Sequence, residues 1–265
     1  MISIDTELIK EIVGTGKRID NRGFDEYREI KIEPNIISSA EGSARVKLGN
    51  TEVVAGIKME ISEPYPDTPK EGTMMVTTEF VPLASPEFEP GPPDENSVEA
   101  ARVVDRAIRE SKAIAFEKLC IKEGEKSWTV CIDIDVLNDD GNLIDASGIA
   151  AITALLNTKM PDLDENEKPI YSKKGSKSLP IKEIPVSTTF VKIGDKIMAD
   201  PSLSEKEAMD ARLTVGTVKK GDNIVLCSMQ KGGSVGFTEE EIYQIIEQAE
   251  KKGEELRAKI KKALV

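Results

Sequence analysis

The sequence of 265 residues contains no histidine. This absence excludes a Ser-His-Asp triad, a Cys-His dyad, an HExxH zinc site and any histidine general base. Residues 232–236, Gly-Gly-Ser-Val-Gly, match the GxSxG pattern of a nucleophile elbow, but an elbow serine depends on a histidine base. We therefore interpret this motif as a glycine turn between a strand and the last helix.

Cysteines are few, and long apolar runs are missing. Cys120, Cys131 and Cys227 form no CxxC motif, and their odd number argues against a disulfide framework. They predict buried thiols in a reducing compartment. Charged residues are scattered through the first twenty positions, which leaves no signal-peptide core, and no apolar run is long enough to span a bilayer. We expect a soluble, cytoplasmic protein.

Aromatic residues make up only 4% of the chain, yet aliphatic runs recur, which predicts an ordered core. Asp and Glu number 48 against 36 Lys and Arg, so the net charge is −12. This balance disfavours indiscriminate binding to nucleic acid or acidic lipid. A local basic groove remains compatible with this net charge, because a ligand interacts with the charges of one surface patch and not with the total charge of the chain.

Apolar periodicity predicts an α+β fold with mixed or antiparallel sheets packed against central and terminal helices. In the expected strand 51–61, Ile57 and Met59 alternate with Lys58 and Glu60, so one face is buried and one is wet. No linker divides the chain, which predicts a single domain over residues 1–265. The expected helices cover 5–13, 97–119, 146–156 and 239–264, and the expected strands cover 30–32, 46–48, 51–61, 72–82, 128–136, 188–193, 196–199, 213–218 and 224–229.

Two helix starts carry a capping-box signature, in which a cap residue is followed three positions later by Glu. These are Asn96 with Glu99 and Thr238 with Glu241. Interfaces with partners are expected at exposed edge strands. The candidate edges are residues 72–81 and 186–193.

Asp133 and Asp135 lie on one face of an expected strand, and Asp140 follows in a turn. Alternate strand residues are roughly 7 Å apart, a distance at which two carboxylates can hold Mg²⁺. Carboxylates on a solvated face are the competing interpretation. A Mg²⁺-dependent hydrolase built on these three residues is therefore one functional hypothesis.

Arginines at positions 102, 106 and 109 fall on one stripe of an expected helix, within about 60° of arc. Three guanidinium groups on one stripe repel one another unless an anion faces them. Asp105 lies one step off that stripe, and Glu99 and Glu110 are close enough to pair with the arginines in part. The stripe therefore indicates either an ion-paired solvated face or a site for a phosphate-rich ligand.

Several motifs, in their order and spacing, resemble the RNase PH family over residues 15–250, and within it the branch of non-catalytic subunits of the archaeal exosome. Residues 1–14 lie outside this resemblance. The motifs are Arg18-x-Asp20-x-Arg22, Glu41-Gly42-Ser43-Ala44 with Gly49-Asn50-Thr51, Asp94-Glu95-Asn96 leading to Ala101-Arg102-Val103-Val104-Asp105-Arg106, and Asp139-Asp140-Gly141-Asn142-x-x-Asp145-Ala146.

The resemblance implies the RNase PH fold and a hexameric ring of three heterodimers with a catalytic sister subunit, around a channel for single-stranded RNA and with RNA-binding cap subunits. Active members open a buried helix with a Ser/Thr-Arg pair that grips phosphate, and here the pair is Ser147-Gly148. A first catalytic Asp aligns with Asp200, but Lys206 stands six residues later. We therefore expect a chain that is inactive alone, with no metal site and no cofactor.

The same resemblance implies that Arg102 and Arg106 bind the RNA backbone, and the helical stripe adds Arg109 as a third RNA-binding residue. Phosphate contacts of this kind position RNA without reading its sequence. The alternative is that the chain is itself a phosphate-dependent 3'-to-5' exoribonuclease. In that alternative, Asp200 and some of Glu205, Glu207 and Asp210 would bind the metal ion. Lys206 would bind phosphate in place of the missing arginine.

Overall fold

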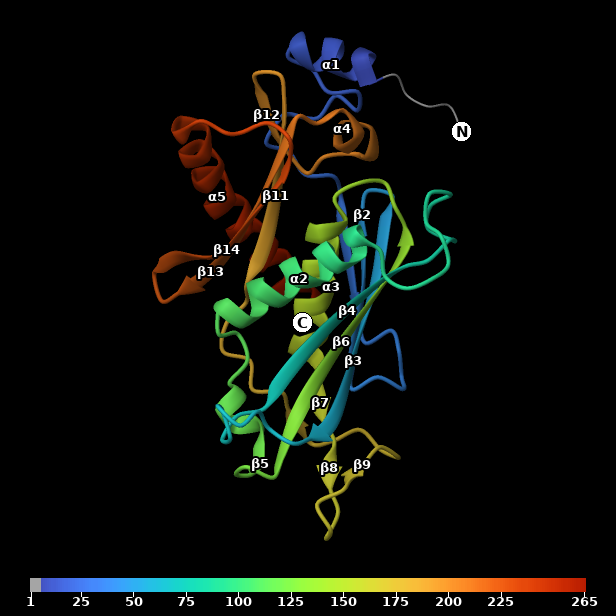
Figure 1. The fold of residues 1–265 in the computed structure, drawn as a ribbon, viewed down its shortest axis with the longest axis vertical. Coiled ribbons are helices and arrows are strands. Elements are labelled where there is room, and N and C mark those ends of the chain that lie inside the picture. The colour runs from blue at the N-terminus through green and yellow to red at the C-terminus, as the bar shows by residue number, and fades with distance from the viewer. Residues whose placement is uncertain (1–5) are drawn as a thin grey trace.

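The computed structural model describes residues 6–265, which form an α+β fold with two principal sheets (Figure 1). The larger sheet has six strands in the order β1-β2-β3-β6-β4, with β5 paired to the start of β6. Only the β4–β6 pairing is parallel, so the sheet is mixed as predicted. Its strands are β1 (Ile30–Pro34), β2 (Gly42–Leu48), β3 (Thr51–Ser62), β4 (Thr73–Phe80), β5 (Cys120–Lys122) and β6 (Lys126–Asn138).

The alternation expected for strand β3 is confirmed. Ile57 and Met59 are fully buried, whereas Lys58 and Glu60 lie on the wetter face. The buried face is covered by α3 (Leu143–Asn157), most of whose residues are inaccessible to solvent. This helix begins three residues earlier than expected, after Asn142 in the left-handed conformation with φ of 56°.

The second sheet has the order β12-β11-β13-β14 and is entirely antiparallel. Strand β11 was expected as an edge, and this is wrong: it pairs with β12 on one side and β13 on the other. The edges of this sheet are β12 and β14, and on β14 the side chains of Val225, Leu226 and Met229 are exposed. The strands are β11 (Val186–Ile193), β12 (Lys196–Ala199), β13 (Ala211–Lys220) and β14 (Asn223–Gly233).

The terminal helix α5 (Glu239–Ala263) packs on β11 and β13. Its capping box is confirmed, because Thr238 accepts from the backbone of Glu241 and the Glu241 side chain accepts from the cap backbone. The GxSxG segment links β14 to this helix, as the turn interpretation expected.

The helix expected over 97–119 is shorter and capped differently. Helix α2 spans Glu95–Glu110, and its N-cap is Asp94, which accepts from the backbone of Ser97. The helix stops at Ser111 because Lys112 adopts a left-handed conformation with φ of 57°, and residues Phe116–Leu119 form a separate 3-10 turn. The capping box expected at Asn96 is wrong, because Asp94 is the N-cap and Asn96 lies within the first turn of the helix.

Two short helices lie together at one end of the molecule (Figure 1). Helix α1 (Thr6–Gly14) buries Ile9 and Val13 beside α4 (Leu203–Ala208), a helix that the sequence analysis missed. Asp5, where the first helix was expected to begin, lies outside the described residues. The remaining short strands are β7 (Lys159–Met160), β8 (Asp162–Leu163), β9 (Pro169–Ile170) and β10 (Lys177–Ser178).

The three cysteines are unpaired, as expected, but only Cys131 is buried; Cys120 and Cys227 are half-buried. Across residues 6–265, no helix combines the length and the apolar character that a membrane span requires.

Candidate nucleic-acid interface

Helix α2 presents Arg102 and Arg106 on its outer face. Both residues are exposed, while Val103 and Ala107 beside them are buried against the body of the molecule. Neither arginine makes a hydrogen bond or an ion pair with any described residue. Two guanidinium groups one helical turn apart are therefore free to meet phosphate groups.

The third arginine of the stripe behaves differently. Arg109 donates to both carboxylate oxygens of Asp105 at 3.0 and 2.7 Å, and also to the carbonyl of Met74 at 3.1 Å. The hydrogen bonds to Asp105 raise the pKa of Arg109. The structure thus divides the stripe into two unpartnered arginines and one that is tied to its own helix.

Shallow grooves flank the two free arginines, and both residues line both grooves. One groove, of about 490 Å³, lies between α2 and β14 and includes Met229 and Gln230. The other, of about 470 Å³, lies between α2 and the β4 edge and includes Met75. The cationic pair therefore stands between two exposed strand edges that carry apolar side chains.

Glu99 was expected to pair with the arginine stripe or to complete a capping box. Instead its Oε1 accepts from Arg212 at 2.6 Å and from Gln230 at 2.9 Å. These contacts join α2 to the second sheet. They also engage the carboxylate of Glu99, one helical turn before Arg102, so that it does not neutralise this arginine.

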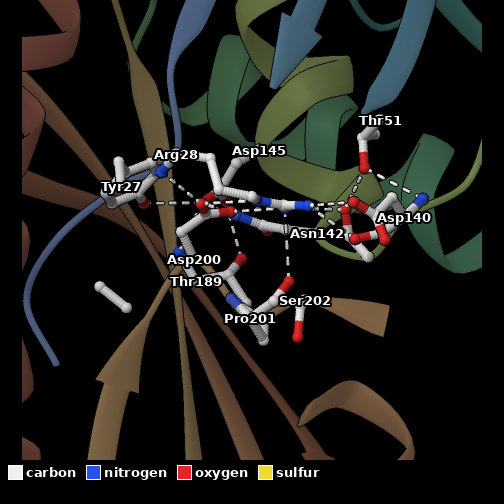
Figure 2. A network of polar contacts seen from close by, with 12 residues as sticks. Tyr27, Arg28, Thr51, Asp140, Asn142, Asp145, Thr189, Asp200, Pro201 and Ser202 are labelled. Carbon is white, nitrogen blue, oxygen red and sulfur yellow. Dashed lines mark hydrogen bonds and ion pairs between the residues drawn. The ribbon is translucent and has the colours of Figure 1, made fainter. Parts of the chain in front are cut away.

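Asp200 lies at the centre of a buried polar network (Figure 2). Its Oδ1 accepts from Arg28 and Asn142 at 2.8 Å each, and its Oδ2 accepts from Arg28 and from Arg22 at 2.8 Å. Burial alone would raise the pKa of Asp200, but the hydrogen bonds and charge of Arg28, aided by Asn142, hold it below its ordinary value. Both oxygens are occupied, so this carboxylate is not free to bind a metal ion.

The other acidic residues of this region are also engaged. Arg18 is 1% exposed and donates to both oxygens of Glu205 at 2.8 and 2.6 Å. Asp210 accepts from Lys10 and from the backbone of Gly194. The contacts with Glu205 hold Arg18 inside the molecule, while most of the basic segment 17–28 around it lies at the surface. The sequence analysis missed this role of Arg18, although the paired arginines of the Arg-x-Asp-x-Arg motif were a signal.

A second buried carboxylate, Asp145, joins the first residues of α3 to the second sheet (Figure 2). It accepts from Tyr27, from Asn142 and from the backbone and hydroxyl of Thr189. Burial raises its pKa to about 6, although these hydrogen bonds oppose the rise. Burial and the neighbouring Asp145 also raise the pKa of Tyr27 well above its ordinary value.

Ser147 and Gly148, the positions compared with a phosphate-gripping pair, lie in the second turn of α3. The Ser147 hydroxyl is buried and has no hydrogen-bond partner among the described residues. A Cβ at Gly148 would meet no atom within 4 Å. Lys206 lies 3.6 Å from Asp139 and lines a separate cavity of about 50 Å³ with Arg212 and Asn142.

The acidic strand shows no metal site. Asp133 is exposed and accepts from Thr77 at 2.6 Å, whereas Asp140 lies near Arg28. Burial and the charges of Glu79 and Asp133 raise the pKa of Asp135. Within residues 6–265, no group of three or more Asp, Glu or Cys side chains is arranged to hold a metal ion.

Comparison with known families gives two matches along the chain. Residues 26–161 match domain 1 of the 3' exoribonuclease family, RNase PH, and residues 183–252 match domain 2 of the same family. Together these matches span most of the chain and include both principal sheets.

Relatives and solved structures agree with this match. The chain is 48% identical to the exosome complex component Rrp42 of Thermococcus kodakarensis over 266 residues, covering 100% of this chain and 97% of that protein. It is also 48% identical to Rrp42 of Archaeoglobus fulgidus, covering 98% and 97% of the two chains. A chain of the Archaeoglobus fulgidus exosome, solved with RNA bound to the active site, matches with a TM-score of 0.88 and 48% identity over 96% of each chain. A chain of an archaeal exosome core matches with a TM-score of 0.84 and 44% identity, over 97% of this chain and 96% of that one.

Proposed function

The chain belongs to the 3' exoribonuclease family, RNase PH, and from that premise we propose that it is a non-catalytic, RNA-gripping subunit of an archaeal exosome ring. In this role it supports phosphorolytic 3'-to-5' RNA degradation by a catalytic sister subunit and helps to structure that subunit's active site. Three copies alternate with three sister subunits in a hexameric ring, RNA-binding cap subunits complete the complex, and the complex works in the cytoplasm. Relatives named exosome complex component Rrp42 support the assignment.

The observation that carries the proposal is the free pair Arg102 and Arg106. Both are exposed on α2 without a partner among the described residues, in a chain whose net charge is −12. Guanidinium groups bind phosphate oxygens with paired, charge-assisted hydrogen bonds and read no base. The pair therefore suits an RNA backbone that must move past it in any sequence.

A non-catalytic role is supported by the carboxylates. Asp200 is held by Arg22, Arg28 and Asn142, and Glu205 is held by Arg18. Releasing either carboxylate would leave buried arginines without a counterion, which is strongly unfavourable. Gly148 offers no side chain that could grip phosphate, so we propose that phosphorolysis is performed elsewhere in the ring.

The partner surface is proposed at the two strand edges beside α2. Strand β4 ends one sheet with Met75 exposed, and β14 ends the other with Met229 exposed. Unpaired strand edges with apolar side chains are surfaces that assembly covers. A sister subunit seated there would bring its own active site to Arg102 and Arg106.

The assay is phosphorolysis of labelled poly(A) with Mg²⁺ and inorganic phosphate, scored by RNA shortening and ADP release. We expect no activity from this chain alone, and activity when it is mixed with the catalytic RNase PH-family subunit of the same organism. Clear activity of this chain alone would overturn the non-catalytic assignment.

The RNA contact is tested in the assembled ring with the double variant Arg102→Ala/Arg106→Ala. Each lost phosphate contact to a single strand lowers the slope of log affinity against log salt by about 0.7, so the slope should shrink by about 1.4. The matched control is Lys259→Ala/Lys262→Ala, which removes from α5 two exposed cations that pair with no residue in the described part of the chain. Equal slopes for both variants would refute the RNA contact.

A further inference from the structure

A cleft of about 580 Å³ lies between the end of β4 and the start of α2, along the proline-rich segment 82–94. Carboxylates dominate its polar lining, and no lysine or arginine is found among its described lining residues. The carboxylates are those of Glu79, Glu87, Glu89 and Asp94.

Three of these carboxylates have no counterion. Glu79, Glu87 and Glu89 are exposed and form no ion pair with any described residue, whereas Asp94 caps α2. Like charges gathered around one cleft repel one another, and a bound cation would relieve that repulsion.

The floor of the cleft supplies a second, independent signal. Thr78 is 3% exposed, and its Oγ1 has no hydrogen-bond partner among the described residues. A buried hydroxyl without any hydrogen-bond partner is costly to keep, and it can both donate and accept. A ligand that carries N–H groups would supply a donor to its oxygen.

The wall of the cleft is aromatic and stiff. The rings of Phe80 and Phe88 stack with centroids 4.8 Å apart, and both line the cleft. Residues 90–93, Pro-Gly-Pro-Pro, hold the facing backbone in a restricted range of conformations. A preformed wall of this kind loses little entropy when it binds a ligand.

We propose that this cleft binds an arginine side chain presented by a segment of a partner protein. The guanidinium group is planar, stacks on aromatic faces, carries a positive charge and offers five donors in a fixed geometry. It would lie against Phe88, donate to Thr78 and pair with Glu87 or Glu89. RNA is disfavoured because the carboxylates repel its phosphates, and the inference does not depend on the exosome assignment.

The test is NMR titration of the full chain with acetyl-Gly-Arg-Gly-Arg-Gly-amide, observing the methyl group of Thr78. We expect saturable shifts of Thr78 with this peptide and none with the neutral analogue in which citrulline replaces both arginines. The variant Glu87→Gln/Glu89→Gln should bind about tenfold more weakly, because it removes two charge-assisted contacts. The control Glu239→Gln/Glu240→Gln changes the net charge equally on α5 and should bind as the wild type does.

Both substituted residues of the test variant are exposed, so it should keep the wild-type fold, which the unshifted methyl spectrum outside the cleft checks. Equal binding of the citrulline peptide would overturn the proposal. So would an absence of shifts at Thr78, or equal weakening by the control variant. Shifts of Thr78 caused by Mg²⁺ or poly(A) in place of the peptide would also overturn it.

Discussion

Arg28 and Asp200 are 172 residues apart in the sequence and share three hydrogen bonds. The backbone and Nε of Arg28 donate to Oδ2 at 2.8 and 2.9 Å, and a terminal nitrogen donates to Oδ1 at 2.8 Å. Asp200 is buried, with a left-handed φ of 49°, so its position depends on these contacts. Asp200 aligns with a catalytic residue of active family members. In this structure, its carboxylate instead holds the first part of the chain against the second sheet.

Replacing Asp200 should therefore affect stability first. Asp200→Asn leaves Arg28 and Arg22 without their buried counterion, and we expect the free energy of unfolding to fall by about 3–5 kcal/mol. Asp133→Asn is the matched control, because Asp133 is exposed, and it should change stability by less than about 0.5 kcal/mol. Urea unfolding measures both, and a stable Asp200→Asn protein would contradict the structural role.

Two glycines near the start of α3 should respond in opposite directions. Gly141 has φ of 87°, and a Cβ there would lie 2.5 Å from the backbone nitrogen of Leu203. Gly141→Ala should destabilise the protein by more than about 2 kcal/mol, through strain and the clash with this backbone. Gly148→Ala meets open space inside a helix and should stabilise it by about 0.5–1 kcal/mol. Thermal unfolding of the two variants decides the comparison.

The pH dependence of stability should carry the signature of Asp145. Its folded pKa of about 6 lies above the ordinary value of 3.8, so its contribution to stability is fully present below pH 3.8 and is lost as the pH rises through 6. Relative to Asp145→Asn, the wild type should gain about 2.4 kcal/mol between pH 7 and pH 4. The contribution of Asp200 to stability changes with pH in the opposite direction. Its pKa is lowered in the folded state, so its contribution is present above pH 3.8 and is lost as the pH falls below that value. Asp200 is present in both the wild type and Asp145→Asn, so the difference between their urea midpoints reports on Asp145 alone. Parallel pH profiles of the two proteins would count against the raised pKa of Asp145.

Substitution of Arg109 should lower the stability of the protein while leaving its RNA binding largely unchanged. Its ion pair with Asp105 is partly exposed, with 41% of the arginine side chain accessible, and solvent screening limits its value to about 1 kcal/mol or less. Arg109→Gln should cost that much stability and change the salt dependence of RNA binding less than Arg102→Gln does. Fluorescence anisotropy with labelled poly(A) across a salt series, on the assembled ring, makes the comparison. A larger effect at Arg109 would show that its bond to Asp105 opens when RNA binds.

Local patterns predicted most of the elements correctly. The alternation of Ile57 and Met59 with charged residues placed β3 and its buried face, and the Thr238–Glu241 box placed the start of α5. These signals succeed because strand and helix periodicity and helix caps depend on residues close in sequence. The box expected at Asn96 is wrong because Asp94 caps the helix two residues earlier, and the carboxylate of Glu99 instead contacts Arg212, more than a hundred residues away.

The sequence by itself determined that histidine chemistry is impossible, that the fold is α+β, and that cationic residues fall on one stripe of the second helix. Only the tertiary structure decided which of those cations are free, because Arg109 finds Asp105 while Arg102 and Arg106 find no described partner. It also decided that β11 is an interior strand and that Asp200 is a counterion within a closed network. The physical reason is that charge pairing and strand order depend on groups brought together from distant parts of the chain, which no local pattern records.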